Sequence, residues 1–212
     1  MSHIKALFHD TPPVLKGPYD AHYLFKVLST AILMFIGFSL VIEPNFILVA
    51  FGILLLGYSL YLLKKFEFDV FDFKTFSWKL IIIPIIGYLT ILLNDSILVR
   101  FVDTLENQSA VDAEIKNYSF IVTLFTVAIL PAVFEELIFR VLLLKALFRK
   151  HLFIGLIFSS VLFALAHGLG SVVEFFLFFN SAVIFGLVYL YTKRIEAAIL
   201  CHFINNFISL IG

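Results

Sequence analysis

Long runs of hydrophobic positions, separated by short polar segments, make up most of this chain. The pattern predicts membrane-spanning helices at about residues 24–42, 46–63, 80–99, 152–166, 172–191 and 195–211. Most of these runs approach the roughly 20 apolar residues that cross a lipid bilayer as an α-helix. Residues 118–148 add one further span. We therefore expect an all-α polytopic membrane bundle of about seven spans, within a range of six to eight.

One further apolar stretch, residues 118–148, is longer than a single span requires. As one helix it would extend about 46 Å, against about 30 Å for the hydrocarbon core of a bilayer. Pro131 lies near its middle and should kink or break a helix. The sequence therefore predicts either one long kinked helix or two pieces that meet near Pro131.

The pattern divides the chain into three parts. Residues 1–23 are a polar tail broken by prolines, residues 24–114 hold the first predicted spans, and residues 115–212 hold the spans with unusual polar residues. We expect the two helical parts to form one compact membrane domain.

Composition and charge narrow the class of protein further. The chain is 62% hydrophobic and 14% charged, whereas a soluble domain is about half apolar and a quarter charged. The formal net charge is zero and no basic run is present, so we expect the lipid bilayer as a partner and no nucleic acid. Cys201 is the only cysteine, which excludes an intrachain disulfide.

Positive charges are distributed unevenly between the predicted loops. With seven crossings, twelve of the fifteen lysines and arginines fall on one side of the membrane. They lie in the tail with Lys26 and in the segments 64–79, 145–150 and 193–194. Cytoplasmic loops carry the excess of positive charge. We therefore expect a multi-pass membrane protein with its N-terminus in the cytoplasm.

Three ionisable residues, Glu135, Glu136 and Arg140, lie within the stretch 118–148. Charges inside a span are rare and usually face the bundle interior or a water-filled cavity. Glu136 and Arg140 are four residues apart, so they share a helical face and can pair. Glu135 is rotated by about 100° and can keep a free carboxylate. The trio is either a structural ion network or part of a functional site.

Two other predicted spans carry polar residues at helical spacing. Phe163 and His167 are four residues apart, as are His202 and Asn206, so each pair presents one helical face. A single membrane histidine is more often a helix–helix hydrogen bond than a catalytic group. A spare carboxylate, two imidazoles and an amide together supply a base for water and donors for an oxyanion. This combination indicates a hydrolytic site.

The three motifs together resemble the CPBP family of intramembrane proteases. That family includes CAAX-processing prenyl endopeptidases and the bacterial bacteriocin-processing and self-immunity "Abi" group. Its pattern is EExxxR, then FxxxH, then HxxxN or HxxxD, on separate helices. This chain has all three in that order: Glu135-Glu136-xxx-Arg140, Phe163-xxx-His167 and His202-xxx-Asn206. The resemblance covers about residues 115–212, which it identifies as a catalytic helix core.

The resemblance implies a role for each motif residue. Glu135 would be the general base that activates water, and His167 would assist it. His202 and Asn206 would form the oxyanion hole. The other motif residues would be structural supports: Glu136, Arg140 and Phe163.

The need for a metal ion is a separate question. The resemblance favours a glutamate-dependent protease without a metal or other cofactor. The alternative is a zinc site with the ligands Glu135, His167 and His202. The chain lacks HExxH, the helical motif that brings two zinc ligands and a base together, and the metal-free interpretation is preferred.

The expected function is an intramembrane endopeptidase that cleaves a membrane-associated peptide or protein, in a bacterial cell membrane. A prenylated CAAX tail, a leader peptide and a signalling peptide fit the pattern equally. One alternative is a non-enzymatic bacteriocin immunity or scaffold protein of the same fold. A small proton-coupled transporter is less favoured, because the two halves show no inverted repeat.

One geometric requirement follows from this hypothesis. Counting about 1.5 Å per residue from the predicted cytoplasmic side places His202 about 10 Å deep, Glu135 about 20 Å and His167 about 23 Å. These side chains can meet only if the helices tilt strongly or begin at different depths, or if a predicted span boundary is wrong.

Overall fold

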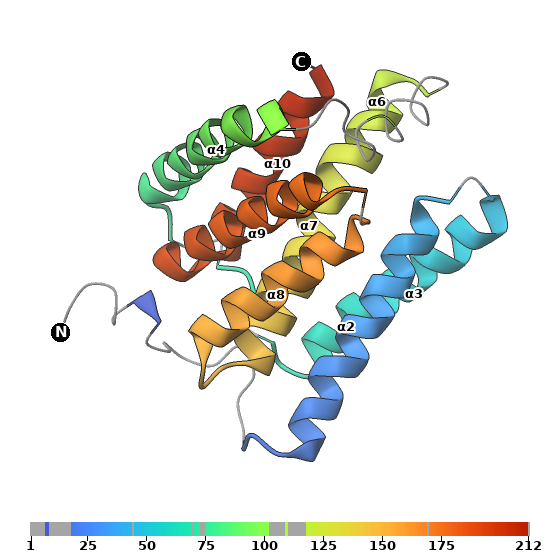
Figure 1. Ribbon diagram of the computed structural model, residues 1–212. Helices are drawn as coiled ribbons and strands as arrows, with labels where there is room; N and C mark the ends of the chain where they lie inside the picture. The colour runs from blue at the N-terminus through green and yellow to red at the C-terminus, as the bar shows by residue number, and fades with distance from the viewer. Residues whose placement is uncertain are drawn as a thin grey trace.

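The predicted all-α membrane bundle is confirmed by the computed structural model (Figure 1). The structure describes residues 7–8, 18–43, 45–68, 70–72, 75–101, 109, 118–168 and 170–211, and every regular element within them is a helix. Most of the predicted N-terminal tail lies outside the described residues.

Six helices agree with the predicted spans to within a few residues at either end. They are α2 (Ala21–Val41), α3 (Phe46–Lys65), α4 (Lys79–Leu98), α8 (Leu152–Ala166), α9 (Val172–Thr192) and α10 (Ile195–Ile211). Short polar side chains begin several of them. The side chains of Asp20, Asn45 and Ser171 accept hydrogen bonds from the first backbone N–H groups of α2, α3 and α9, which have no partner within the helix.

The stretch around Pro131 is one continuous helix of 28 residues, Phe120–Leu147. It consists of α6 (Phe120–Thr123), η2 (Leu124–Ile129), α7 (Leu130–Glu136) and η3 (Leu137–Leu147), of which η2 and η3 are π-helical. Pro131 lies at the start of α7, directly after a π-helical segment. The structure thus shows the single helix of the two predicted alternatives. π-Helical segments are uncommon and occur frequently at functional sites.

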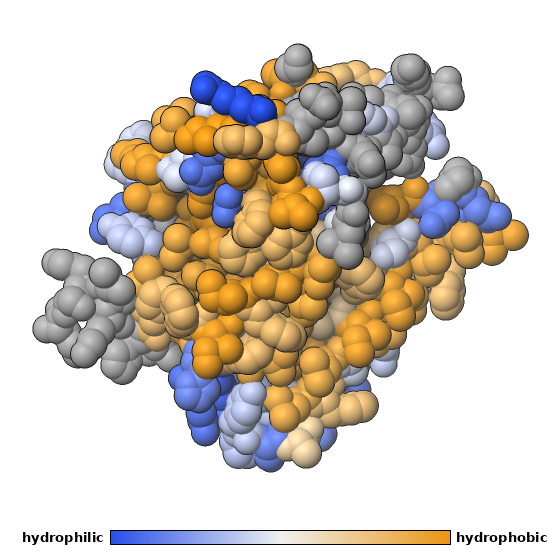
Figure 2. Space-filling view, viewed as in Figure 1, coloured by the Kyte–Doolittle hydropathy of each residue, from blue (hydrophilic) through white to orange (hydrophobic). Residues whose placement is uncertain are grey.

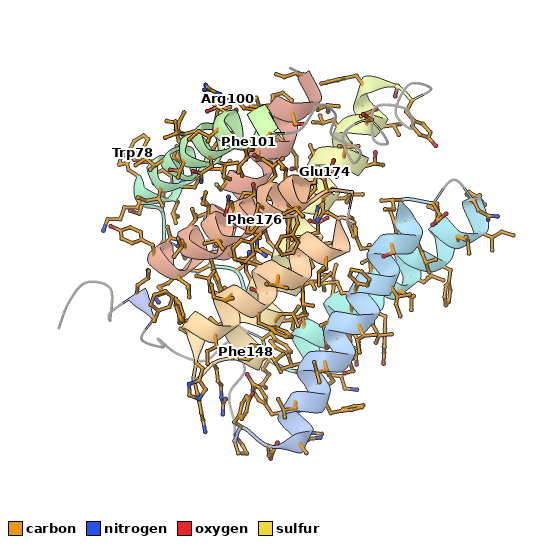
Figure 3. The ribbon with its side chains drawn as sticks, viewed as in Figure 1. Trp78, Arg100, Phe101, Phe148, Glu174 and Phe176 are labelled. Carbon is orange, nitrogen blue, oxygen red and sulfur yellow. The ribbon has the colours of Figure 1, made fainter. Side chains whose placement is uncertain are left out.

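Length and composition fit a membrane protein. Among the described residues, five helices are long and apolar enough to cross a bilayer, while α8 and α10 are shorter apolar helices of 15 and 17 residues. Figure 2 shows a face that is apolar over its broad middle, with hydrophilic residues gathered towards opposite ends. Trp78 at the start of α4 and Arg100 just beyond its end lie near the margins of this region (Figure 3).

The 28-residue helix lies at the centre of the packing. It contacts α2, α8, α9 and α10, and α4 packs against α9 and α10 on the far side. Helices α2 and α3 form a hairpin at one edge of the bundle, and α4 lies at the opposite edge (Figure 1). The motif-bearing helices therefore meet in the interior.

The α2–α3 hairpin depends on two glycines that let the backbones approach closely. A Cβ added at Gly52 would lie 2.8 Å from the carbonyl oxygen of Gly37 and 2.9 Å from Cβ of Leu40. Small residues at helix contacts are a common means of association within membranes. In contrast, a Cβ at Gly57, on the same helix, would meet no atom within 4 Å.

The glycines at positions 52 and 57 provide a matched test of the hairpin. We expect Gly52→Ala to lower the free energy of unfolding by about 1–3 kcal/mol, because the added methyl group overpacks a closed contact. Gly57→Ala should leave it unchanged or slightly higher, because its methyl group meets open space and alanine favours a helix. Equilibrium unfolding in detergent measures both; equal effects of the two substitutions would contradict the close contact.

Candidate active site

Arg140 and Glu136 form a fully buried ion pair within the 28-residue helix. Nε of Arg140 lies 3.1 Å from Oε2 of Glu136, and both side chains are 0% exposed. Nη2 of Arg140 also donates a hydrogen bond of 3.1 Å to the carbonyl oxygen of Ala182 on α9. The guanidinium carbon lies 5.0 Å from the ring centroid of Phe163 and 5.7 Å from that of Phe185. A carboxylate, a carbonyl and aromatic faces therefore replace water around this cation.

The second carboxylate oxygen of Glu136 binds His202 on α10. Nδ1 of His202 lies 3.0 Å from Oε1 of Glu136. The imidazole, 2% exposed, stacks on the ring of Phe185 with centroids 4.4 Å apart and an interplanar angle of 15°. The sequence predicted the pairing of Glu136 with Arg140 but not this link. Glu136 thus connects the EExxxR helix to the HxxxN helix.

The neighbouring carboxylate, Glu135, points to a different group of side chains. Its Oε2 lies 3.8 Å from Nε2 of His167 and 3.9 Å from Nε2 of His202. This oxygen is buried and accepts no hydrogen bond from the described residues. Glu135, His167 and His202 therefore meet, despite the different depths obtained by counting residues. Figure 1 shows why, because the helices are tilted relative to one another.

His167 lies at the end of α8, where a contact with a backbone carbonyl decides which ring nitrogen carries the proton. Nδ1 lies 2.8 Å from the carbonyl oxygen of Phe163. A carbonyl can only accept, so Nδ1 carries the proton in this contact and a neutral ring keeps a lone pair on Nε2. The ring stacks on Phe163 at 4.4 Å and on Phe178 at 4.3 Å. Backbone and aromatic contacts together hold Nε2 towards Glu135.

Phe163 lies between the two groups of polar side chains. Its ring, 2% exposed, contacts His167, His202 and the guanidinium of Arg140. A smaller side chain at this position would leave a cavity beside a buried cation. The structural support expected for Phe163 is consistent with these contacts.

Sequence reasoning missed two aromatic residues of α9, Phe178 and Phe185, which stack on His167 and His202 respectively. Ala182, whose carbonyl binds Arg140, lies between them. The three positions are spaced i, i+4 and i+7, so they share one helical face. This spacing was visible in the sequence, but nothing in it distinguished these phenylalanines from the others in the segment.

Asn206 donates a hydrogen bond to a backbone carbonyl near Pro131. Its Nδ2 donates a hydrogen bond of 3.3 Å to the carbonyl oxygen of Val127 in η2. In an α-helix this carbonyl would accept from the residue four positions later, which is Pro131 and has no N–H. Asn206 therefore supplies a donor that the proline removes. Its amide has a second hydrogen, which stays available for another acceptor.

The geometry also bears on the zinc alternative. Ligand atoms about 2.0–2.1 Å from a tetrahedral zinc ion lie about 3.4 Å apart. The distances from Oε2 of Glu135 to the two Nε2 atoms are 3.8 and 3.9 Å. Within the part of the chain that the structure describes, no group of three or more His, Cys, Asp or Glu residues has the geometry to hold a metal ion.

Comparison with known proteins confirms the resemblance suggested by the motifs. Residues 117–208 match the family model described as type II CAAX prenyl endopeptidase Rce1-like. The matched segment contains all three motifs and the helices that carry them. Comparisons with curated proteins and with solved structures gave no match.

Removing the negative charge of Glu136 should destabilise the protein. We expect Glu136→Gln to lower the free energy of unfolding by about 3–5 kcal/mol, because it leaves a buried guanidinium without its counter-charge. Glu43→Gln is the matched control, since Glu43 is exposed at the end of α2. Unfolding in detergent measures both. An equally small effect of the two substitutions would show that Arg140 does not need the charge of Glu136.

A double-mutant cycle tests the link between Asn206 and Pro131. Asn206→Ala should cost about 1–3 kcal/mol, because the carbonyl of Val127 loses a donor. In a Pro131→Ala background the cost should fall by at least about 0.5 kcal/mol, because the introduced alanine restores a backbone N–H. Unfolding free energies of the four proteins measure this coupling.

Asn205→Ala is the control for this cycle, because its amide bonds only to Asn206 among the described residues. Its effect should be the same in both backgrounds. A cost of Asn206→Ala that is independent of residue 131 would contradict the role of Asn206 as a replacement donor.

Proposed function

We propose that this protein is an intramembrane endopeptidase. Residues 117–208 match the Rce1-like type II CAAX prenyl endopeptidases, which are part of the CPBP family. Its substrate would be a membrane-associated peptide or protein. The observation that supports this function is the convergence of Oε2 of Glu135 with Nε2 of both His167 and His202. These atoms come from three different helices.

In this proposal, Glu135 and His167 hold the attacking water. Both present acceptors, an ionised carboxylate oxygen and the lone pair of Nε2, separated by 3.8 Å. A water molecule can donate one hydrogen bond to each of two acceptors at this separation, with normal lengths of about 2.8 Å. Its oxygen lone pairs then point away from both, towards a substrate carbonyl. Glu135 is the general base, because a carboxylate can take the proton as the oxygen attacks.

Donors for the oxyanion would come from α10. Nδ1 of His202 binds Glu136, so Nε2 can donate only if the ring carries a second proton. With both glutamates ionised and Arg140 charged, a proton on His202 makes the net charge of the cluster zero. Nε2–H of His202 and the second N–H of Asn206 would then stabilise the developing negative charge.

The reaction is balanced without a further reactant. The water oxygen bonds to the carbonyl carbon, and the water proton moves to Glu135 as charge develops on the carbonyl oxygen. When the tetrahedral intermediate collapses, the C–N bond breaks and Glu135 returns the proton to the leaving amine. The products are a carboxylic acid and an amine, and Glu135 is again a carboxylate.

The setting of the reaction is also part of the proposal. The excess of positive residues in the loops after α3, η3 and α9 supports a cytoplasmic N-terminus. A bacterial cell membrane is the proposed location, because the composition rich in Phe, Ile and Leu resembles that of the bacterial members of the family. Glu136, Arg140 and Phe163 would position the reacting groups without touching the substrate.

A non-enzymatic immunity or scaffold protein remains the competing function. It would use the same buried network for packing alone and bind a partner within the membrane. Glu135 separates the two hypotheses, because its Oε2 has no hydrogen-bond partner among the described residues. A protein that needed the network only for packing would gain nothing from this carboxylate.

We expect Glu135→Gln to reduce cleavage of fluorogenic peptides in detergent or nanodiscs by about 10²–10⁴-fold, because the general base is lost. Folding should be unchanged, since Glu135 makes no ion pair with Arg140. A zinc chelator should leave the wild-type rate unaltered. Turnover is measured across a peptide panel, with Glu43→Gln as the control.

The outcomes separate the hypotheses. Cleavage that survives Glu135→Gln removes this residue as the base. No cleavage by the wild type, with partner binding retained in Glu135→Gln, supports the scaffold function. Loss of cleavage with the chelator, restored by added Zn²⁺, supports the zinc alternative.

A further inference from the structure

One face of α10 is polar from the candidate active site to the end of the helix. It consists of His202, Asn205, Asn206 and Ser209, at positions i, i+3, i+4 and i+7. We refer to these four residues as the α10 stripe. The remaining positions of this part of α10 are apolar. Such spacing directs the stripe to one side of the helix.

Exposure increases steadily along the stripe. His202 is buried, Asn205 and Asn206 are partly exposed, and Ser209 is exposed. Seven residues separate the first from the last, which is about 10 Å along the helix axis. The stripe thus connects the buried imidazole to the end of the bundle where α10 finishes, seen at the top of Figure 1.

The stripe has fewer protein partners than its amides can bind. Nδ2 of Asn206 donates to the carbonyl of Val127 at 3.3 Å, and Nδ2 of Asn205 lies 3.5 Å from Oδ1 of Asn206. Each amide has four hydrogen-bonding positions. Polar groups within a bilayer must be satisfied by protein or by water, because lipid tails offer no partner.

A second observation comes from the neighbouring helix. One face of α4 packs on α9 and α10, where a Cβ at Gly87 would lie 2.9 Å from Sγ of Cys201. Ile91 and Asp95 continue this face at i+4 and i+8. Oδ1 of Asp95 is buried and has no hydrogen-bond partner among the described residues. The proposed reaction makes no use of this carboxyl group.

The level of Asp95 in the bundle relates it to the stripe. Helices α4 and α10 run in the same direction (Figure 1). Because Gly87 lies beside Cys201, eight residues further along each helix bring Asp95 to about the level of Ser209. The partly buried side chain of Asp95, whose Oδ1 has no hydrogen-bond partner among the described residues, therefore lies near the exposed end of a polar helical face. Glu174, buried in the first turn of α9, is at the same end of the bundle (Figure 3).

We propose that the α10 stripe and Asp95 line a hydrated path that carries water from this end of the bundle to Glu135. The ligand is water itself, held by amide, hydroxyl and carboxyl groups. The need for such a path rests on the proposed hydrolytic function, but the hydration of the stripe does not. The path opens on the face opposite the lysine- and arginine-rich loops.

Cysteine accessibility tests this proposal without relying on catalysis. Methanethiosulfonate reagents modify the thiolate, which forms only where water reaches the sulfur. Cys201→Ala removes the only native cysteine. Into this protein we would introduce Asn205→Cys or Ser209→Cys on the stripe, and Ile204→Cys or Phe207→Cys as controls on the other side of α10. Each control lies within two residues of its partner in sequence and so at nearly the same depth.

We expect the charged reagent methanethiosulfonate ethylsulfonate to modify Asn205→Cys and Ser209→Cys in nanodiscs at least about tenfold faster than the controls. All four cysteines should react equally after denaturation in SDS, which verifies free thiols. Equal rates in the native protein for Asn205→Cys and Ile204→Cys would overturn the proposal, because the stripe would then be as dry as the opposite face.

Asp95 is tested as a positioning residue in the same assay. Asp95→Leu should slow modification of Asn205→Cys at least about fivefold and lower kcat more than KM, whereas Asp95→Asn should retain both. Thr90→Leu, an exposed position on α4, should change neither. Unchanged labelling with Asp95→Leu would remove Asp95 from the path.

The two proposals can fail separately. A labelled stripe in a protein whose cleavage survives Glu135→Gln would retain the hydrated path and reject the assigned base. Loss of cleavage with Glu135→Gln alongside an unlabelled stripe would retain the base and reject the path.

Discussion

The buried ion pair between Arg140 and Glu136 is the interaction on which the rest of the bundle depends. Each charge loses several kcal/mol of solvation when it leaves water. The loss is offset only if other helices bring partners to the same point. The carbonyl of Ala182 comes from α9, the ring of Phe163 from α8 and the imidazole of His202 from α10. Burying this ion pair therefore brings four helices together.

That convergence also creates the arrangement on which the proposed reaction depends. Glu136 is engaged on both oxygens, by Arg140 and by His202. The adjacent Glu135 is rotated away from this pair and faces the Nε2 atoms of both histidines. In the proposed function, Glu136 has a structural role and Glu135 acts in the reaction. The two can differ because successive residues of a helix point in directions about 100° apart. Local helical geometry is sufficient to explain why the motif contains two acidic residues.

The sequence predicted the helices well, because long apolar runs bounded by turn signals such as Glu43 to Asn45 leave little choice of boundary. It also predicted the Glu136–Arg140 pair from spacing alone. The link from Glu136 to His202 and the stacking of Phe178 and Phe185 were not predictable, since they depend on tilts and rotations between helices. Counting depth along vertical helices separated His202 from His167 by about 13 Å, whereas the structure brings both to Glu135.

The two shortest helices of the bundle affect the surrounding lipid. At 1.5 Å per residue, α8 and α10 extend about 22 and 25 Å, less than the roughly 30 Å of an average hydrocarbon core. Acyl chains beside them must shorten or tilt to avoid exposing polar ends, at a cost of fractions of a kcal/mol per ångström of mismatch. We therefore expect a thinner bilayer next to α8, so that membranes of short-chain lipids accommodate this protein most easily.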